Sequence, residues 1–109
     1  MAAACRGASE LGALTVGILP GLDRAAANAW VKVAIPTGLG ELRNGLVVRA
    51  AEAVVAVGGA YGTLSEVALA LRAGVPVIGL QTWEIDGVER AASADDAAAR
   101  AIERVRAQP

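Results

Sequence analysis

The chain has 109 residues, a net charge of −1, one cysteine and no histidine. This length suits a single domain, and the lone Cys5 cannot form an internal disulfide, so cysteine usage gives no sign of secretion. The absence of histidine excludes an imidazole base and every zinc site that needs one, and we expect no metal site. The near-neutral charge argues against nucleic-acid binding, and no apolar run reaches the ~20 residues of a membrane span. We therefore expect a cytoplasmic protein that binds neither nucleic acid nor membrane.

Four short runs rich in Val and Ile lack polar alternation, which is typical of parallel strands buried on both faces. Helical segments alternate with these runs, and the alternation predicts a doubly wound α/β fold. In chain order the predicted elements are a helix over 2–11, strands over 14–19 and 31–35, a helix over 41–52, a strand over 53–57, a helix over 63–73, a strand over 75–80 and a helix over 95–107.

Capping residues mark the C-terminus of one predicted helix and the N-terminus of another. Gly74 follows the helix over 63–73 and is placed to end it in the left-handed conformation. Ser93 precedes the last helix and is predicted to cap it together with Asp96. The charges of that helix, including Asp96 and Arg100 four residues apart, are interpreted as a solvated face.

A glycine-rich turn joins the third predicted strand to the helix after it. Three glycines within residues 58–62 let the backbone turn tightly and approach a ligand. The free N–H groups at the helix start suit a phosphate, although the turn has neither a Walker lysine nor a GxGxxG pattern. A tight turn without a ligand is the alternative. We favour a phosphate-binding loop, with Gly58, Gly59, Ala60, Tyr61, Gly62 and Thr63 as candidate binding residues.

Glu66 lies one turn into this helix and has two interpretations. Thr63 and Glu66 form the pattern of a capping box, which requires no function. A predicted buried stripe of Leu64, Val67, Ala68 and Leu71 leaves Glu66 off the stripe, beside any phosphate bound at the helix start. Capping and catalysis both remain open for Glu66.

Arg43 follows a second glycine segment, residues 37–40. Its helical neighbours three and four positions away are apolar, so its permanent charge needs an anionic partner. A buried salt bridge to Glu41 or Glu66 and a clamp on a phosphate both satisfy this need, and we favour the clamp.

Two further features concern partners. Trp83 follows the last predicted strand, where open α/β sheets place ligands, and either stacks on a ring or packs as a lid. The helices over 41–52 and 63–73 carry wide apolar faces with few charges, which predicts a homodimer or a higher homo-oligomer.

Residues 59–66, Gly-Ala-Tyr-Gly-Thr-Leu-Ser-Glu, resemble the Pro-Gly-Gly-x-Gly-Thr-x-x-Glu motif of the LONELY GUY (LOG) superfamily, also called lysine decarboxylase-like. Segments 17–21, 37–40, 43–44 and 82–87 are more similar to its branch of molybdenum cofactor carrier proteins and related Rossmann-like nucleotide-binding proteins. The resemblance covers nearly the whole chain. It implies a Rossmann-like three-layer sandwich with a mainly parallel sheet, and a phosphorylated nucleotide-like ligand. The candidate ligands are the molybdenum cofactor and a nucleoside monophosphate, with no cofactor required, and the further ligand-binding residues are Thr37, Gly38, Gly40, Arg43 and Asn44.

Enzymes of the superfamily hydrolyse a nucleoside 5′-monophosphate to the free base and ribose 5-phosphate. The resemblance places their essential arginine and glutamate on Arg43 and Glu66. Two departures favour the carrier branch over a hydrolase: Ala60 replaces the second motif glycine, and Asn44 replaces the lysine of the enzymes. An inactive remnant is the third alternative.

The first eight residues resemble the interior of family members, just after a Gly-Gly-x-Gly-Val loop. This resemblance leads us to expect that residues 1–109 form one incomplete domain, which lacks the first strands of the family.

Overall fold

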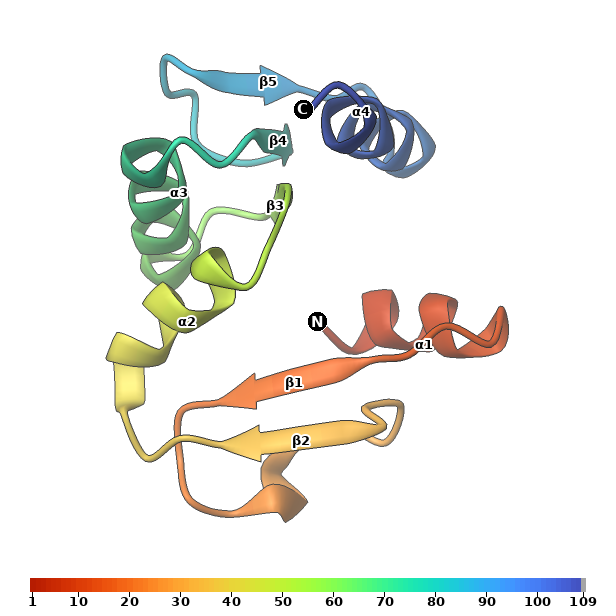
Figure 1. Cartoon of the computed structure of the whole chain (residues 1–109), viewed down its shortest axis with the longest axis vertical. Coiled ribbons are helices and arrows are strands. Elements are labelled where there is room, and N and C mark those ends of the chain that lie inside the picture. The colour runs from red at the N-terminus through yellow and green to blue at the C-terminus, as the bar shows by residue number, and fades with distance from the viewer. Residues whose placement is uncertain (109) are drawn as a thin grey trace. The chain divides into compact units, whose positions relative to one another are not determined.

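The computed structural model describes residues 1–108. The chain divides into two compact units, which we call the N-terminal unit (Met1–Arg43) and the C-terminal unit (Asn44–Pro109). Each unit combines helices with parallel strands, as Figure 1 shows. The predicted α/β class with parallel strand pairing is therefore confirmed. Along residues 1–108, no helix has both the length and the apolar character needed to span a membrane.

The N-terminal unit is built around one parallel strand pair. Its elements are α1 (Ala2–Glu10), β1 (Val16–Leu19), the 3-10 turn η1 (Arg24–Ala26), β2 (Val33–Pro36) and the 3-10 turn η2 (Gly40–Leu42). Thr15 fastens the start of the pair, because its buried hydroxyl donates to the carbonyl of Trp30 (2.6 Å) and accepts from the backbone N–H of Lys32 (2.9 Å). A buried hydroxyl with both bonds made adds no desolvation cost.

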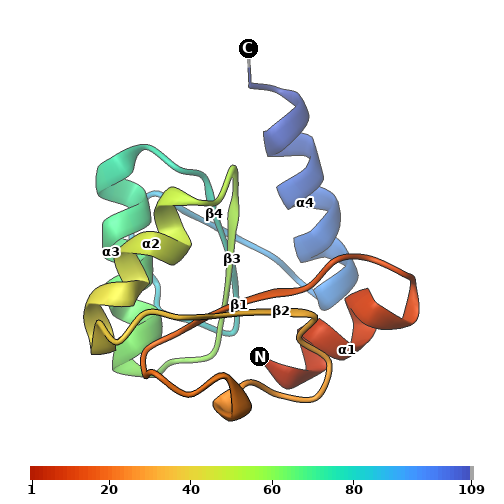
Figure 2. The same ribbon diagram turned by 60° about the horizontal axis from the view of Figure 1, so that its bottom comes forward.

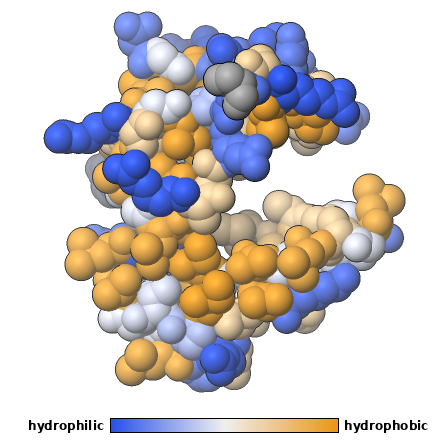
Figure 3. Space-filling model, viewed as in Figure 1, coloured by the Kyte–Doolittle hydropathy of each residue, from blue (hydrophilic) through white to orange (hydrophobic). Residues whose placement is uncertain are grey.

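The strands of this unit are less buried than their composition predicts. Val16, Val33 and Ile35 are 49%, 42% and 45% exposed. Figure 3 shows hydrophobic surface over the β1–β2 pair. The expectation of strands buried on both faces is therefore wrong for this pair.

The C-terminal unit holds a three-stranded parallel sheet of order β3–β4–β5. Figures 1 and 2 show α3 and α4 on opposite sides of this sheet. In register, Val54 lies opposite Val77, and Val77 lies opposite Val88. The elements are α2 (Arg43–Arg49), whose first residue is the last of the N-terminal unit, β3 (Val54–Val57), α3 (Tyr61–Ala73), β4 (Val77–Leu80), β5 (Val88–Arg90) and α4 (Ala94–Arg106).

The core of this unit is small and made of short side chains. Its cluster draws on α2, β3, α3 and β4 and is formed by Val48, Ala56, Val67, Ala70 and Val77. Ala56 and Ala70 leave little side chain between helix and strand, so α3 can approach the sheet closely. Every fully buried apolar side chain among residues 1–108 belongs to this unit.

Several element boundaries differ from those predicted. The helix expected over 41–52 divides into η2 and α2, and the helix expected from residue 63 begins at Tyr61. Strand β5 was not predicted, because two of its three residues are charged. The predicted capping residues are confirmed: Gly74 ends α3 at φ +77°, and the Ser93 hydroxyl accepts from the Asp96 N–H at 3.1 Å.

Candidate functional site

The glycine loop connects the carboxyl end of β3 to the start of α3. The Gly58 N–H donates to the carbonyl of Leu80 (3.3 Å), and the Thr82 hydroxyl donates to the carbonyl of Gly58, so the end of β4 and the segment after it fix the loop. Helix α3 begins after Ala60, which supplies no side-chain cap. The first bond of the helix runs from the Leu64 N–H to the Ala60 carbonyl (3.1 Å). The N–H groups of residues 61–63 therefore have no acceptor within the helix.

Two glycines of this loop are not required by the fold. Gly58 has φ +84°, a conformation that side chains disfavour. Gly59 and Gly62 have no positive φ, and a Cβ built on either would meet no atom within 4 Å. Glycine at Gly62 costs helix stability relative to alanine. Neither backbone conformation nor packing therefore accounts for glycine at these two positions.

The capping-box interpretation of Glu66 is wrong. Because α3 starts at Tyr61, the capping position is Ala60, and Thr63 is the third residue inside the helix. The buried side of α3 also differs from the predicted stripe, since Val67 and Ala70 are fully buried and Ala68 is exposed. Thr63 and Glu66 are half-buried on the side of Ala70. The catalytic role of Glu66 stays a prediction.

An aromatic pair lies beside the glycine loop. The rings of Tyr61 and Trp83 stack with their centroids 6.1 Å apart and their planes at 24°. The Trp83 indole N–H points to the Ala60 carbonyl at 3.4 Å, a long hydrogen bond. Tyr61 nonetheless remains 83% exposed. Sequence reasoning noted each residue but not the pair, although the ends of neighbouring parallel strands meet at one sheet edge.

Arg43 and Asn44 open helix α2. Arg43 is half-buried, and its Nε is a buried donor with no hydrogen-bond acceptor among the described residues. A buried donor without a partner costs about 1–3 kcal/mol, so an acceptor placed next to this Nε would recover that free energy. Asn44 is buried, with 5% of its surface exposed.

The predicted binding residues Thr37, Gly38 and Gly40 belong to the N-terminal unit. The Thr37 hydroxyl donates to the Leu19 carbonyl at 2.6 Å, and the N–H groups of Gly38 and Gly40 donate to the carbonyls of residues 21 and 20 at 2.9 Å each. Gly38 and Gly40 have φ of +66° and +58°, which by itself explains glycine at both. Their role in ligand binding stays a prediction.

Charges gather at the other side of the C-terminal unit, where α4 meets β5. Glu89 accepts from Arg100 at 3.2 Å and from Arg104 at 2.7 Å, and Arg100 also bonds Asp96 at 3.0 Å. The hydrogen bonds from Arg104 and then Arg100 lower the pKa of the Glu89 carboxyl. The Ala92 N–H, followed by Arg100, lowers the pKa of Asp96. The predicted pairing of Asp96 with Arg100 on the solvated face of α4 is confirmed, and Arg100 and Arg104 also attach the helix to Glu89 on β5.

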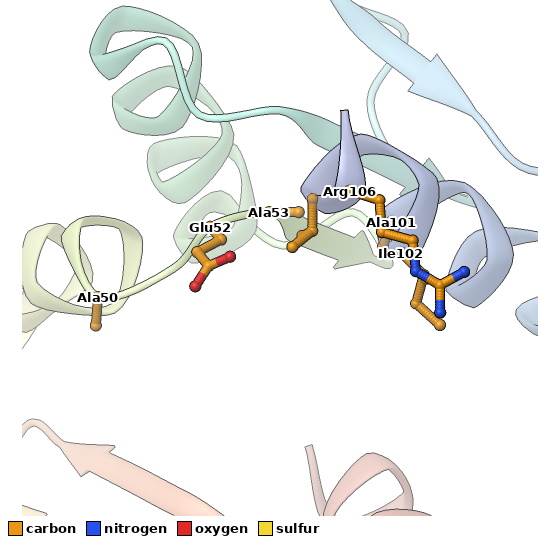
Figure 4. A pocket seen from close by; sticks show the side chains of 7 residues that line it. Ala50, Glu52, Ala53, Ala101, Ile102 and Arg106 are labelled. Atoms are coloured by element: carbon orange, nitrogen blue, oxygen red, sulfur yellow. The ribbon is translucent and has the colours of Figure 1, made fainter. Parts of the chain in front are cut away.

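A hollow of about 440 Å³ lies between α4 and the segment before β3 (Figure 4). Its wall is mostly apolar, with Glu52 and Arg106 as its charged members. Ala53, in the wall, directly precedes β3, so the hollow is at the opposite end of the strand from the glycine loop. No group of His, Cys, Asp and Glu suited to a metal ion occurs within residues 1–108. The glycine loop, rather than this hollow, is the candidate site.

Comparisons with known proteins agree with the sequence resemblance. The molybdenum cofactor binding protein of the phototrophic bacterium Rippkaea orientalis superposes with a TM-score of 0.84 at 35% identity, over 94% of this chain and 69% of that one. The molybdenum cofactor carrier protein of Chlamydomonas reinhardtii gives a TM-score of 0.82 at 36% identity, over 96% and 69% of the two chains. An uncharacterized protein of Archaeoglobus fulgidus is 40% identical over 81 residues, which are 74% of this chain and 53% of that protein.

The chain thus spans about half the length of the curated relative and about two thirds of the solved relatives. These likenesses confirm the Rossmann-like fold and the resemblance to the carrier branch. The profile of the SLOG cluster4 family matches residues 1–107. The chain therefore belongs to the SLOG cluster4 family.

Proposed function

We propose that the chain binds a phosphorylated nucleotide-like ligand at the glycine loop and acts as a carrier, with the molybdenum cofactor as its cargo. The observation that carries this proposal is the bare backbone at Gly59 and Gly62, where neither backbone conformation nor packing requires glycine. The loop leads into a helix of 13 residues without a side-chain cap. A phosphate at this position accepts from the N–H groups of residues 61–63 and lies at the positive end of the helix dipole.

Arg43 supports the same chemistry from its own side chain. Its buried Nε lacks an acceptor, and a phosphate oxygen would make a charge-assisted hydrogen bond there. The assignment of Arg43 to the ligand of the glycine loop rests on the family resemblance. An anionic cargo suits both features, and the solved relatives in Rippkaea and Chlamydomonas are described as binding or carrying the molybdenum cofactor. The role implies a protein that works in the cytoplasm.

Cofactor retention tests this proposal. The protein is incubated with molybdenum cofactor released from a molybdoenzyme and passed through a desalting column, and the pterin that elutes with the protein is measured by fluorescence after oxidation. We expect near-stoichiometric pterin with the wild type and a large loss with Gly59→Val, whose side chain would occupy the space above the loop. The proposal fails if the wild type retains no more pterin than an unrelated protein, or if Gly59→Val retains as much as the wild type.

We also propose that the protein self-associates. Leu46 on α2 and Leu69 on α3 are 45% and 39% exposed, on two helices that share one core cluster. A second copy would cover this apolar surface. Sedimentation velocity at tens of micromolar is expected to show a dimer or larger species, and a Leu69→Glu variant is expected to shift the distribution towards the monomer. A wild type that sediments as a monomer contradicts the proposal.

A further inference from the structure

Tyr61 is an aromatic residue whose presence the fold does not explain. It is the first residue of α3, yet 83% of its surface is exposed, so it contributes little to the core. Tyrosine is also a poorer helix former than alanine. A large exposed ring at the start of a helix contributes free energy only when another group packs against the ring.

The position of the Tyr61 ring is set by neighbours from the end of β4. Trp83 stacks against one side of the ring, with the centroids 6.1 Å apart and 24° between the planes. Trp83 in turn reaches the Ala60 carbonyl at 3.4 Å, and the adjacent Thr82 hydroxyl bonds the Gly58 carbonyl. Gln81 turns the chain out of β4 at φ 50°, a conformation that a non-glycine residue adopts at a cost. Thr82 and Trp83 thus tie the aromatic pair to the backbone of the glycine loop.

The exposed ring of Tyr61 belongs to the residue that directly follows the bare loop. Tyr61 follows Gly59 and Ala60 directly, and nothing lies within 4 Å of a Cβ built on Gly59 or Gly62. A ligand whose phosphate binds the first N–H groups of α3 would therefore extend its remaining atoms past the exposed Tyr61 ring. A planar heterocycle gains from such a surface, because stacking on an aromatic side chain needs no specific hydrogen-bond pattern.

We infer that the Tyr61–Trp83 pair is a stacking platform for the planar ring of the ligand, and that it selects phosphate esters carrying a purine-like or pterin-like ring over those without one. The inference rests on the proposed phosphate site. Tyr61 contacts the ring, and Trp83 supports Tyr61 from behind. Specificity then has two parts, since the glycine loop binds any phosphate and the aromatic pair adds affinity for a ring.

Paired ligands separate the two parts. Adenosine 5′-monophosphate and ribose 5-phosphate differ by a planar base, and 6-hydroxymethylpterin phosphate provides a second ring. Calorimetry of the wild type is expected to show both ring-bearing esters binding about tenfold more tightly than ribose 5-phosphate, which corresponds to ~1.4 kcal/mol. Tyr61→Leu is expected to remove this advantage, because it weakens binding of the ring-bearing esters about tenfold more than binding of ribose 5-phosphate. Tyr61→Phe, which keeps the ring, is expected to retain it.

Fluorescence gives a second readout. In a Trp30→Phe background Trp83 is the only tryptophan. A ligand ring stacked on Tyr61 is expected to change the emission of Trp83, whereas ribose 5-phosphate is expected to leave the emission unchanged. Equal affinity of the wild type for ring-bearing and ring-free esters, or an equal loss for both in Tyr61→Leu, would overturn the platform and leave the phosphate site standing. Failure of the wild type to bind any of the three esters would overturn the proposed function and the platform with it.

Discussion

Replacement of Gly62 by alanine is expected to stabilise the fold and weaken the ligand complex. Alanine is favoured over glycine in a helix by about 0.5–1 kcal/mol, and a Cβ at Gly62 meets nothing within 4 Å, so no packing strain offsets this gain. For a domain of this size such a change raises the melting temperature by about 2–8 °C.

The same methyl group would obstruct the ligand. Side chains of an α-helix tilt towards its N-terminus, so the added Cβ projects towards the space in which a phosphate would lie. The loss of one charge-assisted hydrogen bond costs about 1.5–3 kcal/mol, which is a ten- to roughly 150-fold loss of affinity. Gly59→Ala is expected to weaken binding as well, but without a gain in helix propensity, because Gly59 lies outside the helix.

The assay pairs thermal unfolding with calorimetric titration of a phosphate ester on the same preparations. Gly7→Ala is the matched control, since Gly7 lies within α1 and its Cβ would also meet nothing within 4 Å. The control is expected to keep full affinity. A Gly62→Ala variant that binds the ester like the wild type would show that the added methyl group does not obstruct the ligand. A variant that unfolds at a lower temperature would show that glycine serves the fold.

Three further predictions concern Arg43, the hydrolysis of adenosine 5′-monophosphate, and Glu89. Arg43→Ala is expected to weaken phosphate-ester binding by about 1.5–3 kcal/mol, whereas unchanged affinity in calorimetry would make Arg43 structural. Incubation with adenosine 5′-monophosphate is expected to release little or no adenine, as measured by chromatography, because Asn44 and Ala60 replace the lysine and glycine of the related enzymes. Turnover that Glu66→Gln abolishes would instead establish a hydrolase. Glu89→Gln is expected to lower the free energy of unfolding at pH 7 by about 1 kcal/mol or less. Because the folded-state pKa of Glu89 is lowered, the contribution of Glu89 to the free energy of unfolding is present above the ordinary carboxyl pKa near ~4.3 and is lost as the pH falls through the lowered value. Urea titrations that show the same difference in stability between the wild type and Glu89→Gln at pH 7 and pH 3 would contradict this.

The order of helices and parallel strands was predictable because each element carries a local signal. Apolar runs indicated β1, β2, β3 and β4, and the ends of two helices followed from Gly74 and Ser93. Strand β5 escaped because Glu89 and Arg90 look like surface residues. Only the fold shows that Glu89 pairs with Arg100 and Arg104 on α4, eleven and fifteen residues away.

In the candidate site, too, some features were predictable from the local sequence and others were not. The glycine loop was predictable because its backbone chemistry is local to one strand–helix connection. The true start of α3 was not, since neither Ala60 nor Tyr61 is a capping residue. The stacking of Tyr61 on Trp83 depends on the parallel pairing of β3 with β4, which brings residues 22 positions apart to one sheet edge. Local patterns thus indicated the candidate loop, and long-range pairing was needed to find the aromatic surface beside it.

Binding of a phosphorylated ligand at the start of α3 is tested most directly by an amide-resolved NMR titration. The ¹⁵N-labelled protein is titrated with adenosine 5′-monophosphate, and the shift of every backbone amide is followed. We predict the largest and saturable shifts at Gly59, Gly62 and Thr63, with the Trp83 indole N–H moving in parallel. Saturable shifts confined to other segments, or no saturable shift at any amide of the loop, would contradict the account.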